Sequence, residues 1–403
     1  MSDPSRARVS GPLAPFAPGF VAELLGAGYR PVSASFQLQL MAHLSRWMQA
    51  NAVTTEALAG EELERFLAAR RSAGYTNYLS PEALVPVVRY LRGLGVVPAA
   101  ESPAFSAIDA LLERYRAYLI IERGLAVVTT VVYADMVRPF VASRLETDGR
   151  LDLAGLAPSD VLAFVLAEAE RRPRRSAKLL VTALRSLLRF LHVEGLTARP
   201  LASVVPSVAA WRLSGLPRSL EAEQVQALLA SCSRQALVGR RDFAILLMLV
   251  RLGMRRGEVA ALQLDDIDWR SGELLVRGKG SSVERLPLPV DVGEALADYL
   301  RHGRPEDAEG REVFVRVKAP PRALTPPGVS QVVVGAARRA GLGQIGAHRL
   351  RHTAATELLR AGAPLVEIGQ LLRHRAELTT AIYAKVDRDR LRELARPWPG
   401  GAA

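Results

Sequence analysis

The chain has 403 residues, 49% of them hydrophobic and 23% charged, so it can bury a sizeable core and is not a disordered polypeptide. Lys and Arg number 53 against 41 Asp and Glu, and the resulting charge of +12 favours a polyanionic partner, nucleic acid before a membrane surface. The single cysteine, Cys232, excludes a disulfide framework and a cysteine-based zinc site. The first residues carry Pro and charge where a signal peptide needs an apolar stretch, so we expect a cytoplasmic protein.

Two stretches rich in Pro, Ala and Ser, 96–106 and 204–219, divide the chain into three segments. We predict an N-terminal helical domain over residues 1–100, a second helical domain over 107–203, and a domain over 219–403 that ends in a C-terminal tail. The predicted fold class is mainly α with a small β-hairpin or sheet.

Apolar residues at helical spacing predict helices in the first two segments, around 40–47, 63–70, 108–123, 160–169 and 177–193. The sequence VVRYL at 87–91 returns as LLRFL at 187–191, one hundred residues later. We interpret this as a weak internal duplication of a small helical module, although chance similarity between two amphipathic helices explains it nearly as well.

The sharpest basic cluster lies in the second segment, where residues 171–189 hold seven basic residues and no acid. Such a run at a helix entrance can bind phosphates while Arg side chains reach base edges. A solvated helix face explains a lone run equally well. The candidate nucleic-acid contacts are Arg171, Arg172, Arg174, Arg175, Lys178 and Arg185.

The third segment is predicted to be mostly helical with a small sheet. Ser219 is the expected N-cap of its first helix, with two acidic residues in the first turn. Two strands, 273–277 and 284–288, form a hairpin with a Gly-Lys-Gly tip. Helices are predicted over 240–252, which Gly253 ends, and over 292–302, 329–340, 348–361, 365–372 and 379–385.

Six residues of the third segment could share one chemistry, although each alone has a plain structural explanation, such as a capping arginine or a packing tyrosine. Arg side chains pair bidentately with phosphate oxygens, and Lys and His transfer protons. A Tyr hydroxyl near cations is favoured as a phenolate nucleophile. Such a site would attack a phosphodiester without a metal or other cofactor. The six residues are Arg255, Lys279, His348, Arg351, His374 and Tyr383.

The helix predicted over 348–361 carries two of these residues. A spacing of three places His348 and Arg351 on one face of this helix. Arg349 and His352 are expected on an adjacent, more exposed stripe.

The third segment resembles the tyrosine recombinases of the phage integrase family. Residues 245–269, including Gly253, Arg255 and Glu258, are similar to the first conserved box of the family. The hairpin GKGSSVERLPLP is similar to its lysine hairpin, and residues 348–386 are similar to its second box. The middle segment is more loosely similar to the helical, SAM-like core-binding domain of the family.

The resemblance implies a site-specific recombinase that cuts and rejoins DNA strands through a 3′-phosphotyrosyl intermediate, without metal or ATP. Arg256, next to one catalytic arginine, has no role in this interpretation. The resemblance implies that Tyr383 is the nucleophile and that Arg255 and Arg351 clamp the scissile phosphate. It implies that Lys279 protonates the leaving 5′ oxygen and that His348 accepts the Tyr proton. It also implies that His374 donates a hydrogen bond to the phosphate.

The resemblance also implies partners. These are double-stranded DNA, a homotetramer on synapsed sites, and in addition other recombinases or accessory proteins, with association to the nucleoid when bound to DNA. The extra N-terminal domain favours an enzyme that integrates, excises or transposes a mobile element over one that resolves chromosome dimers. A type IB topoisomerase would use much the same residues, but the helical middle domain and short linker argue against it.

The alternative from another class is a catalytically silent or accessory DNA-binding protein of the same fold. The intact set of six residues argues against this alternative, because drift is expected to break at least one of the six positions.

Two positions depart from the family pattern. Arg373 replaces the glycine usual before the second histidine and is expected to alter the helix approach near the site, and Arg349 stands where an acidic residue is frequent. Residues 1–100 match nothing in the family, so they are an arm-type DNA-binding module, a second core-binding copy or a protein-contact domain. The segment 387–398 is predicted to form a short amphipathic helix that docks on a neighbouring protomer or folds back in cis.

Overall fold

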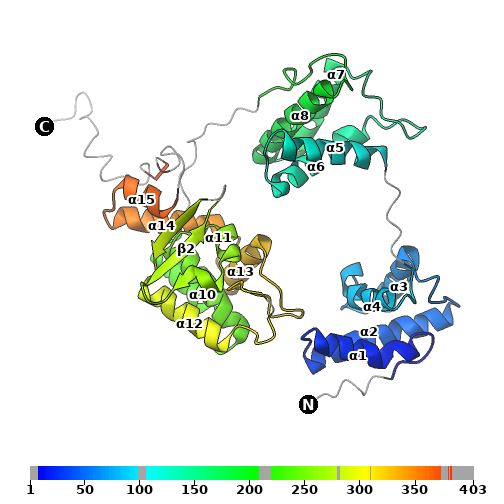
Figure 1. Ribbon diagram of the computed structural model, residues 1–403, viewed down its shortest axis with the longest axis horizontal. Helices are drawn as coiled ribbons and strands as arrows, with labels where there is room; N and C mark the ends of the chain where they lie inside the picture. Colours follow the sequence, from blue (N-terminus) through cyan, green and yellow to red (C-terminus); the bar gives the residue numbers. More distant parts are fainter. Residues whose placement is uncertain are drawn as a thin grey trace. The chain divides into compact units, whose positions relative to one another are not determined.

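The computed structural model describes residues 8–98, 106–207, 219–278, 282–308 and 310–373, with residues 380, 382 and 383. The chain is mostly helical with one small antiparallel sheet, which confirms the predicted fold class (Figure 1). It divides into two compact units, Pro98–Arg212 and the remainder of the chain. The division into three domains therefore stays a prediction, because the first and third segments fall within one unit.

The first segment forms a four-helix module with its own buried apolar core. Its elements are a 3-10 turn η2 (Ala14–Phe16) and the helices α1 (Ala17–Gly26), α2 (Pro31–Ala50), α3 (Gly60–Ser72) and α4 (Pro81–Gly93). Helix α1 packs on α2 and α4, and both α2 and α3 pack on α4. Helix α4 is central to the core because its apolar residues recur on one face, with Leu84, Val87 and Leu91 almost fully buried.

The middle segment is also a four-helix module around a separate apolar core. Its helices are α5 (Ala107–Ile121), α6 (Val127–Ala142), α7 (Pro158–Arg171) and α8 (Arg174–Val193). Helix α5 packs on α6 and α8, and both α6 and α7 pack on α8. The predicted helices of this segment are confirmed.

The third segment surrounds the buried helix α10 (Leu237–Arg251), which packs against α12, α13 and α14. The other helices are α9 (Ala222–Ala230), α11 (Arg256–Ala261), α12 (Val290–His302), α13 (Pro326–Arg339), α14 (Ala347–Arg360) and α15 (Leu365–Leu371). From Asp242 to Leu249, every residue of α10 is buried except Phe243, which is partly buried. The helix is therefore surrounded by the core on nearly every side. This explains why the sequence shows an apolar run here instead of a one-sided stripe.

The sheet has three antiparallel strands in the order β1 (Ile267–Asp268), β2 (Glu273–Arg277) and β3 (Val283–Pro287). The predicted hairpin is confirmed, with Leu275 opposite Arg285. The additional strand β1 pairs with the start of β2 and, with two residues, is too short to produce a visible alternation. A short 3-10 turn η3 (Leu264–Asp266) precedes it.

The predicted N-cap of α9 is wrong. The helix begins at Ala222 with Glu221 as its N-cap, and the Glu221 backbone N–H donates to Gln224 Oε1 at 3.1 Å. Leu220 is fully buried, and its backbone N–H donates to Thr353 Oγ1 at 2.9 Å. Burying Leu220 in this way keeps the chain extended past Ser219, so the N-cap and the start of the helix lie two residues later than predicted.

Candidate functional site

Arg255 is placed by the end of the buried helix α10. Gly253 follows that helix with a φ of 56°, a left-handed conformation that glycine adopts without strain. A Cβ on Gly253 would lie 2.5 Å from Leu372 Cδ2, so close packing also requires a glycine here. The chain then turns, and Arg255 becomes the N-cap of α11.

Glu258 on α11 binds Arg255 at two points. Its Oε2 accepts the backbone N–H of Arg255 at 2.8 Å, and its Oε1 accepts from Nη1 at 2.6 Å. Burial raises the pKa of Glu258, but the charge and hydrogen bond of Arg373, followed by the bonds from Arg255, outweigh burial and lower the pKa overall. Glu258 is therefore a carboxylate that orients Arg255.

Arg351 reaches the same point from α14. Arg351 is 2% exposed. It donates from Nη1 to the Gly253 carbonyl at 2.5 Å and from Nη2 to the Leu372 carbonyl. Burial, followed by the charges of Arg255 and Arg373, lowers the pKa of Arg351 to about 10, which leaves it charged at neutral pH. Arg255 Nη2 donates to the next carbonyl, that of Arg373, at 2.9 Å.

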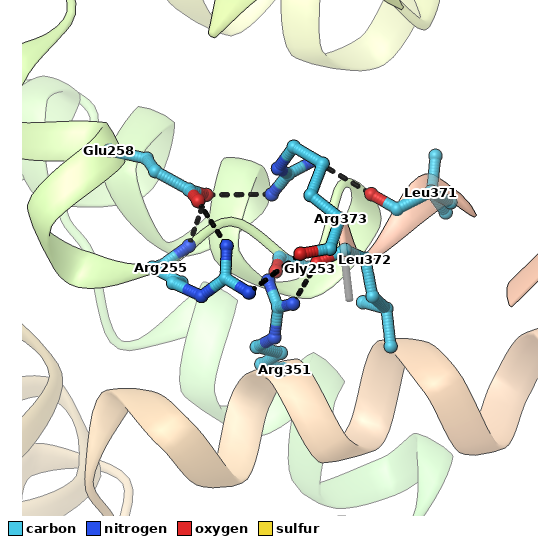
Figure 2. Close-up of polar contacts among 7 residues, drawn as sticks. All are labelled: Gly253, Arg255, Glu258, Arg351, Leu371, Leu372 and Arg373. Carbon is cyan, nitrogen blue, oxygen red and sulfur yellow. Dashed lines mark hydrogen bonds and ion pairs between the residues drawn. The ribbon is translucent and has the colours of Figure 1, made fainter. Parts of the chain in front are cut away.

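Figure 2 shows the guanidinium groups of Arg255 and Arg351 close together, with their donors on backbone carbonyls that follow α10 and α15. Two guanidiniums that share a small region of acceptors can hold the several oxygens of one phosphate. The side chain of Arg255 is 40% exposed, so a ligand can reach it from solvent. Arg256 donates from Nη1 to Ser330 Oγ on α13, at 3.1 Å, instead of to these carbonyls.

Arg373 is a third guanidinium in this cluster, and the sequence interpretation gave it no role in the site. Its Nη2 donates to Glu258 Oε2 at 2.7 Å and its Nη1 to the Leu371 carbonyl at 2.7 Å. It has a φ of 54°, in the left-handed region where glycine is favoured. The signal that could have found it is the replacement of a usual glycine by a charged residue next to His374.

Tyr383 is 2% exposed, and its hydroxyl lies 2.9 Å from Nδ1 of His352. Burial raises the pKa of Tyr383 to about 12, although the charge of Arg351 acts in the opposite direction. The charge of Arg351 favours the phenolate as expected, but burial outweighs it, so the hydroxyl is protonated at neutral pH in this state of the protein. The influence of Arg351 on Tyr383 shows that the nucleophile candidate and one of the two clustered arginines are close enough to interact.

The contact with His352 corrects the predicted exposure of helix α14. His348 is exposed and His352 is half-buried, the reverse of the predicted order. Their rings lie 4.4 Å apart because residues four apart share a helix face. Burial, followed by the charges of His348 and Arg351, lowers the pKa of His352 to about 4. The neutral ring can therefore accept a hydrogen bond from Tyr383.

Two of the six predicted catalytic residues, Lys279 and His374, lie outside the described residues, as does most of the helix predicted over 379–385. The tail segment 387–398 also lies outside them. The structure therefore brings together Arg255, Arg351 and Tyr383, while the complete set of six stays a prediction.

The predicted nucleic-acid contacts on α7 and α8 divide into two groups. The side chain of Arg171 is 76% exposed, and Lys178 is also exposed. Arg171 lies 3.9 Å from the Glu168 carboxylate, and the less exposed Arg172 binds the same carboxylate at 2.5 Å. Arg185 donates to the Val205 carbonyl at 2.7 Å. The side chains of Arg174 and Arg175 lie outside the described part of the chain.

Within the described ranges, no three His, Cys, Asp or Glu side chains gather as a metal ion would require. No helix in those ranges is long and apolar enough to cross a bilayer.

Comparison with known proteins places these residues in a family. The model of the phage integrase family matches residues 218–390, and the model of the phage integrase N-terminal SAM-like domain matches residues 112–195. The chain is 40% identical over 399 residues to y4rA of Sinorhizobium fredii, described as an integrase/recombinase, with 97% of this chain and 96% of that protein covered. It is 32% identical over 292 residues to the tyrosine recombinase XerD of Listeria monocytogenes, with 71% and 97% covered.

A solved structure shares the fold. A lambda integrase tetramer bound to a Holliday junction matches with a TM-score of 0.52 and 19% identity, over 75% of this chain and 85% of that one.

Proposed function

Because the chain belongs to the phage integrase family and is a tyrosine-type site-specific DNA recombinase, we propose that it cuts and rejoins double-stranded DNA through a 3′-phosphotyrosine on Tyr383. The observation that supports this most directly is the meeting of Arg255 and Arg351, from separate helices, close to that buried tyrosine. Two charged forks beside a hydroxyl nucleophile suit attack on a phosphodiester.

The proposed reaction is an exchange of ester bonds. The Tyr383 oxygen attacks the scissile phosphorus, a Tyr–O–P bond forms, and the P–O5′ bond breaks. Arg255 and Arg351 stabilise the charge that develops on the phosphate oxygens. Lys279 gives a proton to the leaving 5′ oxygen, and His374 donates a hydrogen bond to the phosphate. The 5′ hydroxyl of a partner strand then attacks the phosphotyrosine and releases Tyr383, so no ATP is consumed.

Proton removal from Tyr383 is the step that the local environment makes difficult. With a pKa of about 12, the hydroxyl is protonated at neutral pH and needs an acceptor. The family resemblance assigns that role to His348, and His352 is already within hydrogen-bond distance of the hydroxyl. Both imidazoles belong to α14, as does Arg351, so one helix supplies both an acceptor and a phosphate clamp.

The proposed assembly is a homotetramer on synapsed DNA sites, as in the lambda integrase complex described above. The predicted DNA contacts are the basic residues of α7 and α8, of which Arg171 and Lys178 are best exposed. The proposed biological role is integration, excision or transposition of a mobile element, because residues 1–100 exceed what a minimal resolution enzyme needs.

A nicked suicide substrate tests the proposed chemistry. The substrate carries the terminal sequences of the element that encodes the protein, and protein and DNA are separated under denaturing conditions. We expect a covalent adduct that forms with chelator present and without ATP, and that is lost in Tyr383→Phe while DNA binding remains. Tyr299→Phe, which alters the other tyrosine of the C-terminal half, is the matched control and keeps the adduct.

Two results would contradict the proposal. An adduct that persists in Tyr383→Phe would mean that another residue is the nucleophile. Tight binding of the same DNA without any adduct would favour the catalytically silent or accessory DNA-binding protein.

A further inference from the structure

Arg373 contacts both members of the ion pair that orients one phosphate clamp. Its Nη2 donates to Glu258 Oε2 at 2.7 Å, and its backbone carbonyl accepts from Arg255 Nη2 at 2.9 Å. In Figure 2 the side chains of Arg373 and Arg255 approach the Glu258 carboxylate from two different directions. One residue therefore holds the carboxylate and the arginine that the carboxylate orients.

This arrangement is costly for the folded chain. The side chain of Arg373 is 2% exposed, and its Nε is buried without a hydrogen-bond partner in the described structure. Burying an unsatisfied donor and holding a large residue in the left-handed region are both unfavourable. Glycine would avoid both costs, so packing alone does not explain an arginine at this position.

We propose that Arg373 is a positioning residue, which keeps Glu258 ionised and fixed so that Arg255 presents its guanidinium to the scissile phosphate in one orientation. The proposal rests on the proposed function. The charged groups that face Glu258 are Arg255 and Arg373 in direct contact, with Arg351 acting at longer range. Without Arg373, burial of Glu258 is opposed mainly by Arg255, and the carboxylate takes up a proton at higher pH.

Full-length variants Arg373→Met, Arg373→Gly and Arg373→Lys test this role. The first readout is single-turnover cleavage of the suicide substrate over a range of pH, with DNA affinity measured separately. For Arg373→Met we expect cleavage near pH 6 to fall by roughly tenfold or more, with its acid limb moved to higher pH and DNA affinity changed by no more than about threefold. Arg373→Lys is expected to restore much of the lost rate, because it keeps the charge.

The second readout does not depend on cleavage. A carbon NMR titration of the Glu258 carboxyl group, assigned with Glu258→Gln, is expected to show a higher pKa in Arg373→Met than in the wild type. Arg373→Gly removes the backbone strain and is expected to show the same change, so it serves if the Met variant does not fold.

The inference is overturned if Arg373→Met cleaves with the rate and pH profile of the wild type, or if Glu258 titrates identically in both. Failure of the wild-type protein to form any adduct would instead reject the proposed function, and the Glu258 titration would still decide whether Arg373 acts on that carboxylate.

An independent observation concerns residues 8–98, whose final turn repeats that of the middle module. After α4, the backbone N–H groups of residues 94, 95 and 96 donate to the carbonyls of 90, 92 and 91, and after α8 the groups of 194, 195 and 196 donate to those of 190, 192 and 191. Gly95 has a φ of 70° and Gly195 a φ of 69°. Both helices therefore end in the same turn, one hundred residues apart.

The first connection of each module also agrees. Gly28 and Gly124 both have positive φ, and the next helix begins three residues later in each case, at Pro31 and at Val127. In both modules an aromatic pair joins the first helix to the last, with ring centroids 5.4 Å apart. The buried residues of α4 and α8 coincide position by position: Leu84, Val87, Val88, Tyr90 and Leu91 against Leu184, Leu187, Leu188, Phe190 and Leu191.

We infer that residues 8–98 are a second copy of the SAM-like module and that they bind double-stranded DNA through the exposed face of α4. Arg89 and Arg189 occupy equivalent exposed positions on the two final helices. An arginine pair also lies at the C-terminal end of α3 and of α7, Arg70–Arg71 and Arg171–Arg172, although Arg70 is buried. Arg89 lies 4.0 Å from the Glu23 carboxylate at a half-exposed site, where such a pair exchanges readily for a phosphate.

The test compares two charge reversals in the full-length protein. Arg89→Glu is expected to weaken binding to a duplex that carries the complete site and to reduce the slope of log affinity against log salt by about one. Arg65→Glu is the control, because Arg65 pairs with Glu62 on the acidic part of α3. Identical affinities and slopes for the two variants would reject DNA binding by this module and leave a protein-contact role. If the wild-type protein shows no salt-dependent binding to this duplex, the proposed function itself is rejected, before any conclusion about this module.

Discussion

At the scale of single residues, the hydrogen bond between Tyr383 and His352 couples the nucleophile candidate to pH. The pKa of His352 is lowered from its usual 6.5 to about 4, with burial as the largest cause. Between these two values the unfolded chain binds a proton that the folded chain does not. The free energy of unfolding therefore decreases as pH falls through this window.

Replacing His352 by Gln removes this titration while leaving an amide oxygen that can accept from Tyr383. We expect the stability of His352→Gln to depend less on pH between about 4 and 6.5 than that of the wild type. Urea unfolding followed by circular dichroism measures this, with His302→Gln at an exposed position of α12 as the control. Equal pH dependence in all three proteins would show that His352 does not titrate abnormally.

Sequence reasoning placed Arg255 and Arg351 in one site because their local motifs resemble those of a known family. It could not order His348 and His352 by burial, since that depends on where Tyr383 packs against α14. It also treated Arg373 as a departure without a contact. A substitution for glycine indicates that a residue is unusual, but the carboxylate it binds lies 115 residues earlier in the chain.

At the scale of elements, Gly253 determines how α10 leads into the site. Its left-handed φ ends the helix, its carbonyl accepts from Arg351, and its lack of a Cβ admits Leu372. Three structural requirements therefore coincide at one position between α10 and α11.

We expect Gly253→Ala to destabilise the protein by about 2 kcal/mol, because a left-handed alanine is strained and its Cβ overlaps Leu372. Cleavage of the suicide substrate is also expected to decrease, since the carbonyl that holds Arg351 is displaced. The measurements are urea unfolding and single-turnover cleavage.

Gly257→Ala is the matched control, because a Cβ at this position in α11 meets no atom within 4 Å. It is expected to be neutral or stabilising by about 0.5 kcal/mol. Similar destabilisation by both substitutions would mean that the conformation of Gly253 is not special.

The elements that could be predicted have strong local patterns, such as the apolar run of α10 and the two strands of the hairpin. The errors have non-local causes. Strand β1 exists because β2 pairs with its two residues, and α9 starts late because Leu220 is held by Thr353 on a distant helix.

At the scale of the whole molecule, separate apolar cores fill the two four-helix modules and the third segment. The echo between 87–91 and 187–191 was a weak signal in the sequence, because an alternation of apolar residues with one Arg is common in helices. The stronger evidence for a duplication is the pair of matching turns that follow α4 and α8, which share backbone hydrogen bonds and φ values. In the sequence, these turns are marked by little more than Gly95 and Gly195.

The carbonyl groups that hold Arg255 and Arg351 have a consequence for the thermodynamics of DNA entry. The unliganded protein already gives these guanidiniums oxygen acceptors from residues 253, 372 and 373. A scissile phosphate that replaces these carbonyls would exchange one set of acceptors for another. The heat of this step is then expected to be small, and its driving force to come from the entropy of the counterions that leave the DNA.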